Sequence, residues 1–234
     1  MAFRDNIPSV TKNIIIINVL VFAATYVPSW HEWMYETFSL FCPGSPFFHW
    51  WQPVTHMFMH GGVWHIFFNM YTLFFFGCVL ERAWGPKKFL VFYFVTGLGA
   101  ALLHTGVQLI EAHHYMALVS GLDSAAATSA SASLHQLYMT PTVGASGAIY
   151  GVLMGYAMLY PESRLTLLFP PITLKAKWFI IIFAVIELFT GVFGMGGSIA
   201  HFAHLGGMLF GFLLILYWKR RHKLYSYADW SDRI

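Results

Sequence analysis

The sequence predicts an all-α polytopic membrane protein: a bundle of six transmembrane helices with both termini in the cytoplasm. Two observations carry this prediction. First, 58% of the 234 residues are hydrophobic and only 10% are charged, whereas a soluble globular chain carries roughly 25% charged residues. Second, the apolar residues gather in six stretches that qualify, or come close, as transmembrane helices of about 20 residues.

The six stretches are expected to follow one another as helices along the whole chain. Their predicted bounds are Asn13–Pro28, Pro53–Leu80, Phe89–Ile110, Gly144–Tyr160, Trp178–Phe193 and Ser198–Trp218. We predict a single membrane domain over residues 1–234, with a core of 12–220 and a cytoplasmic tail over 221–234. The start of the chain, Met1–Thr11, is mostly polar, so no cleavable signal peptide is expected.

Lys and Arg predict the orientation, because cytoplasmic loops are enriched in these residues. All 13 of them fall near the two ends of the chain or in the loops after the second and fourth stretches. The loops after the first, third and fifth stretches carry none. An even number of spans with both termini cytoplasmic accounts for this distribution.

The two long outer loops differ in composition. Ser29–Gln52 is rich in aromatic residues, which predicts that it lies in the membrane interface. Ala112–Pro141 is rich in Ala and Ser, so we expect a flexible loop with no more than one short helix.

Polar side chains recur at a similar depth, near the predicted outer face, in three of the six stretches. They are His56, His60, His65 and Asn69 in the second stretch, Ser146 and Tyr150 in the fourth, and His201 and His204 in the sixth. In the second stretch, spacings of four residues predict that His56 shares a helix face with His60, and His65 with Asn69. Because polar groups are costly inside a bilayer, this convergence indicates a shared, water-accessible cavity that opens outward.

Glycines at four-residue spacing favour close contact between the fourth and sixth helices. They are Gly147, Gly151 and Gly155 in one helix and Gly207 and Gly211 in the other. Such spacing lets helix backbones approach each other in lipid. Since the glycines of the sixth helix share the face of His204, the contact would bring His204 next to Ser146.

The residues alone leave several interpretations open. Ser146 is either a nucleophile or a small residue that packs among glycines. Paired histidines such as His56 and His60 fit interhelical hydrogen bonds, or metal or haem ligands, as well as catalytic bases. By chemistry alone, His201 is a close rival to His204 as the base.

Three motifs, in order along the chain, resemble those of the rhomboid intramembrane serine proteases. They are His60-x4-His65-x3-Asn69, then Gly144-Ala-Ser146-Gly147 with Tyr150, and then Ala203-His204-Leu-Gly-Gly207-x3-Gly211. Trp51-Gln52 and Glu81-Arg82-x2-Gly85, on either side of the second helix, add to the match. The resemblance covers nearly the whole chain.

The resemblance implies a serine endopeptidase without metal or cofactor, which cleaves transmembrane segments of membrane proteins near the outer face. It implies a dyad of Ser146 as nucleophile and His204 as general base, since only His204 is followed by glycines three and seven residues later. It implies that His65 and Asn69, with the backbone N–H of Ser146, stabilise the oxyanion. His201 would make a packing or secondary polar contact.

The resemblance also implies supporting roles. The ring of Tyr150 would support the catalytic histidine, and the supporting set also includes Gly144, Gly147 and His60. Glu81 and Arg82 would brace the first loop. Gln52 stands where some relatives carry Arg, a departure that concerns loop structure.

One acidic residue falls outside these motifs. Glu187 lies well inside the fifth stretch and matches nothing in the family pattern. We expect it to pair with a histidine or to line the cavity. No Asp or Glu is expected near the outer ends of the helices as a third catalytic member.

The expected partners are transmembrane protein substrates and the lipid bilayer, with no nucleic acid; the oligomeric state stays open. A six-helix core suits a multi-pass protein of the bacterial cytoplasmic (inner) membrane, with an organelle as the alternative.

Two other functions compete with the protease function. One is an inactive rhomboid-like binder of membrane helices, and the other is a metal or haem protein that uses His56, His60, His65 and His201. The presence of Ser146 and His204 argues against the first, and the absence of HExxH disfavours a zinc protease.

Overall fold

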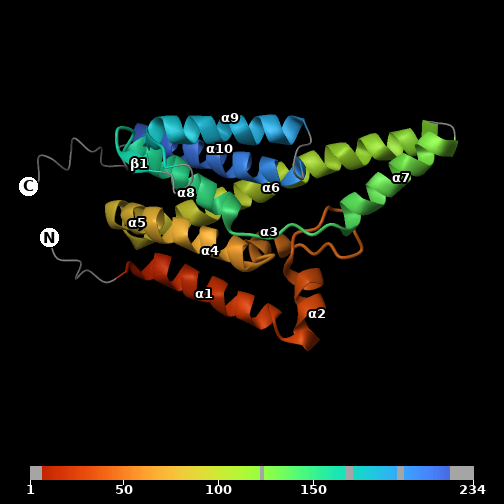
Figure 1. Cartoon of the computed structure of the whole chain (residues 1–234), viewed down its shortest axis with the longest axis horizontal. Coiled ribbons are helices and arrows are strands. Elements are labelled where there is room, and N and C mark those ends of the chain that lie inside the picture. The colour runs from red at the N-terminus through yellow and green to blue at the C-terminus, as the bar shows by residue number, and fades with distance from the viewer. Residues whose placement is uncertain (1–6, 122–123, 167–170, 194–197, 222–234) are drawn as a thin grey trace, which may run out of the picture.

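The computed structural model describes residues 7–121, 124–166, 171–193 and 198–221. Most of these residues are helical, and the helices form an elongated bundle from which one helical hairpin projects (Figure 1). The principal helices are α1 (Ser9–Thr25), α2 (Pro28–Phe38), α4 (Val63–Thr72), α5 (Cys78–Trp84), α6 (Pro86–Gly121), α7 (Ser124–Met139), α8 (Ser146–Leu159), α9 (Ala176–Val192) and α10 (Ser198–Arg220). The short elements are α3 (Gln52–Thr55), the 3-10 turn η1 (His56–Phe58), the π-helical turn η2 (Leu73–Gly77), and the antiparallel strands β1 (Arg164–Thr166) and β2 (Thr173–Lys175).

Three helical segments among the described residues are long and apolar enough to cross a membrane. They are Val63–Trp84, Pro86–Gly121 and Ala200–Arg220. Two shorter apolar helices are Ser9–Thr25 and Ser146–Leu159. Every stretch predicted from the sequence contains a helix, and the count of six membrane crossings stays a prediction.

α6, α8 and α10 form the centre of the bundle, and α9 packs against α8 and α10. Large side chains of α6, including Phe89, Phe92 and Tyr93, are fully buried. Trp84 and Trp218 meet edge to face, with ring centroids 5.6 Å apart, and Phe92 contacts both rings. The apolar core therefore lies between helices that are far apart in the sequence.

Glycines line the contact between α8 and α10, which we call the α8–α10 seam. A Cβ atom on Gly207 would overlap the backbone carbonyl of Gly147, and one on Gly211 would lie 3.2 Å from the carbonyl oxygen of Gly151. The predicted contact between these helices is therefore confirmed. The same glycines also accommodate α6, because a Cβ on Gly147 would lie 2.5 Å from that of Ala100.

The second predicted helix, Pro53–Leu80, is wrong as one continuous element. The chain instead forms α3 and η1, crosses an irregular turn, and starts α4 at Val63. Two adjacent glycines, Gly61 and Gly62, occupy this turn, and glycine is a poor helix former because it loses much backbone entropy. His56 and His60 consequently do not share a helix face.

The prediction of a flexible loop over Ala112–Pro141 is also wrong. α6 continues to Gly121, and α7 returns beside it, so that the two helices form the projecting hairpin (Figure 1). Alanine, abundant in α7, has the highest helix propensity of all residues. A composition rich in Ala and Ser is therefore compatible with a helix as well as with a loop.

Glu81 does not brace the first loop. Its carboxylate accepts hydrogen bonds from the backbone N–H groups of Val10 and Thr11, at 2.9 and 2.7 Å, and from the Thr11 hydroxyl at 2.8 Å. The first N–H groups of a helix lack partners within the helix, and the positive end of its dipole attracts a carboxylate. Glu81 therefore holds the start of α1 against α5, while the Arg82 side chain is exposed.

The first loop is held by Gln52 instead. The Gln52 side-chain amide donates to the carbonyl of Phe47 at 2.7 Å and accepts from the N–H of Phe41 at 3.2 Å. Gln52 itself is fully buried. The replacement of Arg by Gln at position 52 therefore concerns the structure of the loop, as the sequence predicted.

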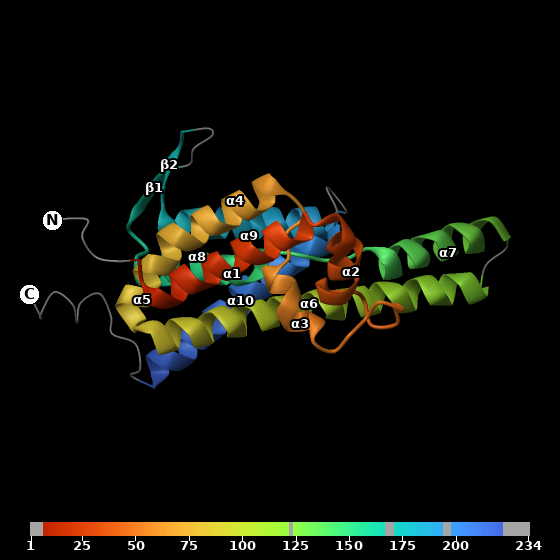
Figure 2. The same cartoon turned by 90° about the horizontal axis from the view of Figure 1, so that it is seen from below.

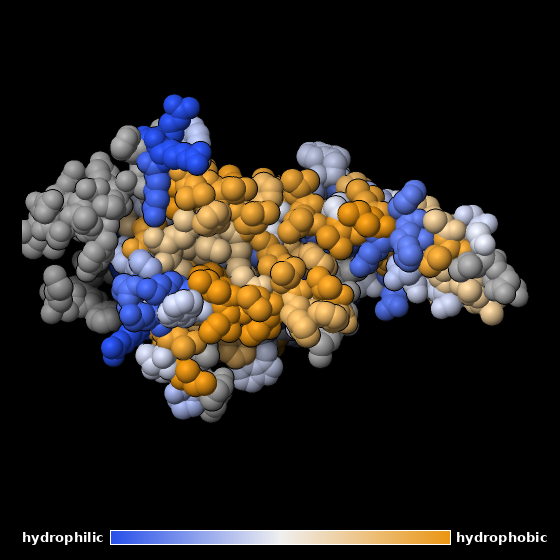
Figure 3. Space-filling model, turned by 90° about the horizontal axis from the view of Figure 1, so that it is seen from above, coloured by the Kyte–Doolittle hydropathy of each residue, from blue (hydrophilic) through white to orange (hydrophobic). Residues whose placement is uncertain are grey.

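α1 begins and α10 ends at the same end of the bundle, where the β1–β2 hairpin stands away from the helices (Figure 2). Figure 3 shows apolar side chains over the middle of the molecule, between hydrophilic ones at this end and on the projecting hairpin. α9 contributes exposed apolar side chains to this surface, among them Ile181, Val185 and Phe189. An apolar middle between polar ends is the pattern of an integral membrane protein. Apart from Arg221, the tail predicted over 221–234 lies outside the described residues.

Candidate active site

Ser146 is the first residue of α8, and the turn before it requires glycine. Gly144 has a φ of 132°, in the region that glycine adopts and L side chains rarely do. A Cβ there would also lie 2.8 Å from Nε2 of His65. The N–H of Gly144 donates to the carbonyl of His56 at 2.9 Å, so this backbone bond fixes the turn against the segment before α4.

The α8–α10 seam brings Ser146 next to His204. Oγ of Ser146 lies 2.8 Å from Nε2 of His204, which is hydrogen-bond distance. The residues are 58 positions apart in sequence, and the close approach of Gly147 to Gly207 sets their separation. The predicted proximity of Ser146 and His204 is therefore confirmed as geometry.

Tyr150 lies one turn after Ser146 and covers one face of the His204 ring. The two rings are stacked, with centroids 4.2 Å apart and planes inclined by 10°. Stacking limits rotation of the imidazole about its side-chain bonds, so Nε2 stays directed at the serine. This is the contact that the resemblance implies for Tyr150.

An acidic residue lies behind the histidine, contrary to the expectation from the sequence. Oε1 of Glu187 lies 3.0 Å from Nδ1 of His204, at ion-pair distance although not aligned as a hydrogen bond. Oε2 of the same carboxylate lies 2.5 Å from Nδ1 of His201. Of the two alternatives that the sequence left open for Glu187, the structure shows the pairing with a histidine. The expectation that no acid lies near the dyad is wrong.

His201 thus makes a secondary polar contact, as predicted. Its Nδ1 faces Glu187, whereas the hydrogen bond to Ser146 is made by His204. One turn of helix separates the two histidines, and their rings lie edge to face 6.4 Å apart.

Two side chains of α4 present hydrogen-bond donors. Nδ1 of His65 accepts the N–H of Gly61 at 3.3 Å, which leaves the proton of the neutral ring on Nε2. That Nε2 is the atom beside Gly144, two residues before Ser146. Nδ2 of Asn69 is buried and has no hydrogen-bond partner, so it also has a free donor.

His60 lies in the turn before α4 and is fully buried. Neither of its ring nitrogens has a hydrogen-bond partner, and its ring packs edge to face against His65 with centroids 5.0 Å apart. Its carbonyl accepts the hydroxyl of Tyr35 at 2.6 Å. His60 therefore contacts the site through the His65 ring, from a loop and not from a helix face.

One group of side chains has the spacing of a metal site in the part of the chain that the structure describes. Donor atoms of Glu187, His201 and His204 lie within 4.8 Å of one another. These contacts do not require a metal ion, because a carboxylate also attracts the ring protons of neighbouring histidines. His56, His60 and His65, the other ligands considered from the sequence, are not in this group.

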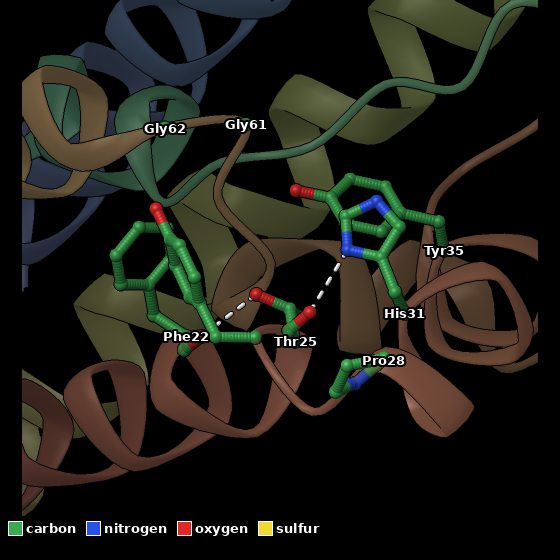
Figure 4. A pocket seen from close by; sticks show the side chains of 8 residues that line it. Phe22, Thr25, Pro28, His31, Tyr35, Gly61 and Gly62 are labelled. Carbon is green, nitrogen blue, oxygen red and sulfur yellow. Dashed lines mark hydrogen bonds between the residues drawn. The ribbon is translucent and has the colours of Figure 1, made fainter.

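A cavity of about 250 Å³ lies between α1, α2 and the Gly61–Gly62 turn (Figure 4). It is lined by Phe22, Thr25, Tyr26, Pro28, His31, Tyr35, Gly61 and Gly62. The side chain of His31 points across it and bonds the carbonyl of Thr25 through Nδ1, at 2.8 Å. The cavity contains neither Ser146 nor His204, so it is separate from the serine–histidine pair.

Glu187 is the residue of this site that the motifs missed. The one available signal was a carboxylate in an otherwise apolar helix. The sequence does not give the register of α9 against α10, which decides what that carboxylate meets.

Comparisons with known proteins agree with the motifs. The family model of the Rhomboid domain matches residues 48–221. The chain is 30% identical to "Rhomboid protease AarA" of Providencia stuartii over 75% of its own length and 58% of that protein. It is 27% identical to "Rhomboid protease GlpG" of Yersinia pestis (strain Pestoides F), over 89% of the chain and 59% of that protein.

A mitochondrial relative is equally similar. The chain is 30% identical to "Presenilin-associated rhomboid-like protein, mitochondrial" of Rattus norvegicus, over 90% of the chain and 50% of that protein. The chain thus spans between half and three fifths of the length of these relatives. With a family match over most of its length, the chain belongs to the rhomboid family.

Proposed function

We propose that this protein is an intramembrane serine endopeptidase, with Ser146 as nucleophile and His204 as general base. One observation carries the proposal: the 2.8 Å contact between Oγ of Ser146 and Nε2 of His204, inside a rhomboid domain. A serine hydroxyl is a weak nucleophile until an adjacent base takes its proton. Two relatives named rhomboid protease support the protease function.

The reaction proceeds by acyl transfer. Oγ of Ser146 attacks the scissile carbonyl carbon while its proton passes to Nε2 of His204. The C–N bond then breaks as His204 returns that proton to the leaving amine, and a water molecule hydrolyses the acyl-enzyme by the same steps. Both side chains are partly exposed, which supports access for water.

The oxyanion of the tetrahedral intermediate needs donors. We assign this role to Nε2–H of His65, to the free amide of Asn69 and to the backbone N–H of Ser146 at the start of α8. Loss of one such donor costs on the order of 2.7–4 kcal/mol in a soluble serine protease. Asn69→Ala should accordingly lower kcat by roughly 10² to 10³.

We also propose six membrane crossings with cytoplasmic termini, which places the site near the outer face. All basic residues of the chain lie near its ends or in loops that this topology puts inside. The substrates are then membrane proteins whose transmembrane segments unwind easily near that face, with a small residue before the cut. The bacterial relatives favour a bacterial cytoplasmic membrane.

The test is cleavage of a generic transmembrane substrate in liposomes. Ser146→Ala and His204→Ala should each abolish cleavage, and a fluorophosphonate probe should label the wild type at Ser146. Ser133→Ala is the matched control, because this partly exposed residue of α7 bonds a carbonyl of its own helix through its hydroxyl. Cleavage by Ser146→Ala, or labelling of another serine, would contradict the nucleophile assignment.

The same assay separates the alternative functions. An inactive rhomboid-like binder would retain substrate in a pull-down but neither cleave it nor react with the probe. A metal protein built on Glu187, His201 and His204 would lose activity in EDTA. We expect a chelator to leave the rate of cleavage unchanged.

A further inference from the structure

Glu187 is a carboxylate of α9 that the family motifs do not explain. Glu187 is 6% exposed, and its neighbours along α9 are apolar. An ionised carboxylate removed from water is stable only when donors surround it. The function of Glu187 can therefore be deduced from the donors that it meets.

Three side chains supply those donors, and all three belong to the candidate active site. Oε1 accepts the hydroxyl of Tyr150 at 2.6 Å and faces Nδ1 of His204 at 3.0 Å. Oε2 faces Nδ1 of His201 at 2.5 Å. The carboxylate thus joins α8 and α10 from a third helix, directly behind the histidine that contacts Ser146.

This position determines which nitrogen of His204 can act as a base. A carboxylate 3.0 Å from a ring nitrogen repels a lone pair and attracts a proton, so the nitrogen that faces it carries the proton. With Nδ1 protonated, Nε2 of the neutral ring has a free lone pair directed at the hydroxyl of Ser146. In the opposite tautomer, Nε2 would already hold a proton and could not take one from the serine.

We propose that Glu187 is a positioning residue, the third member of a Ser146–His204–Glu187 arrangement. It holds His204 in the tautomer that accepts the serine proton at Nε2, and it stabilises the imidazolium that forms. The Nδ1 proton stays on His204 throughout, and the Nε2 proton leaves with the amine. The inference rests on the proposed endopeptidase function.

Tyr150 has a double function in this arrangement. Its ring stacks on His204, while its hydroxyl donates to the oxygen of Glu187 that faces His204. The phenol therefore fixes the carboxylate and the imidazole relative to each other. Such an outer hydrogen bond orients the group that acts on the reacting atoms.

The decisive variant is Glu187→Gln, which keeps the size of the side chain and removes its charge. In a soluble serine protease, the equivalent change of acid to amide lowers kcat about 10⁴-fold through the wrong tautomer. We expect kcat to fall at least about 100-fold with KM within threefold of the wild type, and the fluorophosphonate to label Ser146 correspondingly more slowly. Glu111→Gln on α6 is the matched control, and it should keep the wild-type kcat.

Glu187→Asp keeps the charge but withdraws it by one methylene. We expect a kcat between those of the wild type and Glu187→Gln, again with an unchanged KM. If Glu187→Gln does not fold, this variant carries the test alone, with an expected fall in kcat of roughly tenfold. A purely structural role would instead lower the Tm and the fraction of labelled enzyme while leaving kcat per labelled enzyme unchanged.

The inference is overturned if a folded Glu187→Gln, or failing that a folded Glu187→Asp, cleaves with the wild-type kcat. It is also overturned if Asp and Gln lower kcat equally, because charge would then be irrelevant. Ser146→Ala in the same assay keeps the two proposals apart. Loss of cleavage in Ser146→Ala with normal cleavage in Glu187→Gln rejects only the third member, whereas unchanged cleavage in Ser146→Ala rejects the endopeptidase itself.

Discussion

Two glutamates, Glu187 and Glu162, each face two basic groups but in opposite surroundings. Glu187 lies in the packed region beside the α8–α10 seam, where its partners come from two other helices. Glu162 lies before the β1–β2 hairpin, where its carboxylate contacts Lys175 at 2.7 Å and also Lys177, with its side chain 60% exposed. Exposed pairs are screened by water and contribute little to stability. The comparison of the two glutamates indicates that the packing around a charged pair, more than the pair itself, holds its side chains in one fixed arrangement.

Among the variants that test this contrast and keep Ser146 and His204, the largest expected effect comes from loosening the packed region. In Gly207→Ala, the new methyl group overlaps the carbonyl of Gly147, so α8 and α10 must separate. Overpacking of this kind costs about 1–3 kcal/mol, and a shift of about 1 Å at a catalytic group costs roughly 10²-fold in rate. Thermal unfolding in detergent and cleavage in liposomes measure the two effects.

Gly106→Ala is the control for this variant. Apart from the adjacent backbone of α6, no described atom lies within 4 Å of a Cβ at Gly106, and alanine favours the helical state. The Gly106→Ala protein should have at least the wild-type Tm and an unchanged rate. Equal behaviour of the two variants would show that close approach at Gly207 is not required.

Tyr150→Phe tests the link between the carboxylate and the histidine. It removes the hydroxyl that bonds Glu187 and keeps the ring that stacks on His204. A hydrogen bond to a charged group contributes about 1.5–3 kcal/mol, so we expect kcat to fall by about tenfold or more. Tyr150→Leu also loses the stack and should be slower still. A wild-type kcat in the Phe variant would remove Tyr150 from the arrangement.

His201→Asn removes the partner of the other carboxylate oxygen. Since Oε1 keeps its contacts with Tyr150 and His204, we expect the rate of cleavage to stay within about tenfold of the wild type. The paired variant His204→Asn should abolish cleavage. The reverse ranking of these two variants would identify His201 as the base.

The smallest effect is expected at the exposed pair. Hydrogen bonds from Lys175 and Lys177 lower the pKa of Glu162 from 4.5 to about 2. Because the pKa is lower in the folded state, the pair stabilises the fold above pH 4.5 and loses this effect as the pH falls through about 2. Glu162→Gln should remove this part of the pH dependence of Tm and leave kcat unchanged. A large loss of activity in Glu162→Gln would abolish the contrast with Glu187.

The sequence predicted the centre of the site because its signals are local and repeated. Glycines at four-residue spacing marked the faces of α8 and α10, and these faces meet at Gly147 and Gly207. The family motif assigned His204 and not His201, and His204 is the histidine that contacts Ser146. Such patterns give the facing sides of two helices before any coordinates exist.

Other features depend on packing that no local pattern encodes. Glu187 meets His204 because α9 lies at a particular register against α10, and periodicity alone does not contain that register.

The break before α4 did have a local signal, the pair Gly61 and Gly62, which the long apolar run obscured. The helicity of α7 was obscured in the same way, because small residues are common both in loops and in helices.

The length of α6 has a practical consequence. With 36 residues, this helix is about 54 Å long, against roughly 30 Å for the hydrocarbon core of a bilayer. A soluble reporter fused through the projecting hairpin would therefore be tied to the core of the bundle by one continuous helix. Such a fusion would give single-particle cryo-electron microscopy an alignment feature outside the detergent micelle, and its sensitivity to added protease in sealed vesicles would report the sidedness of the membrane domain.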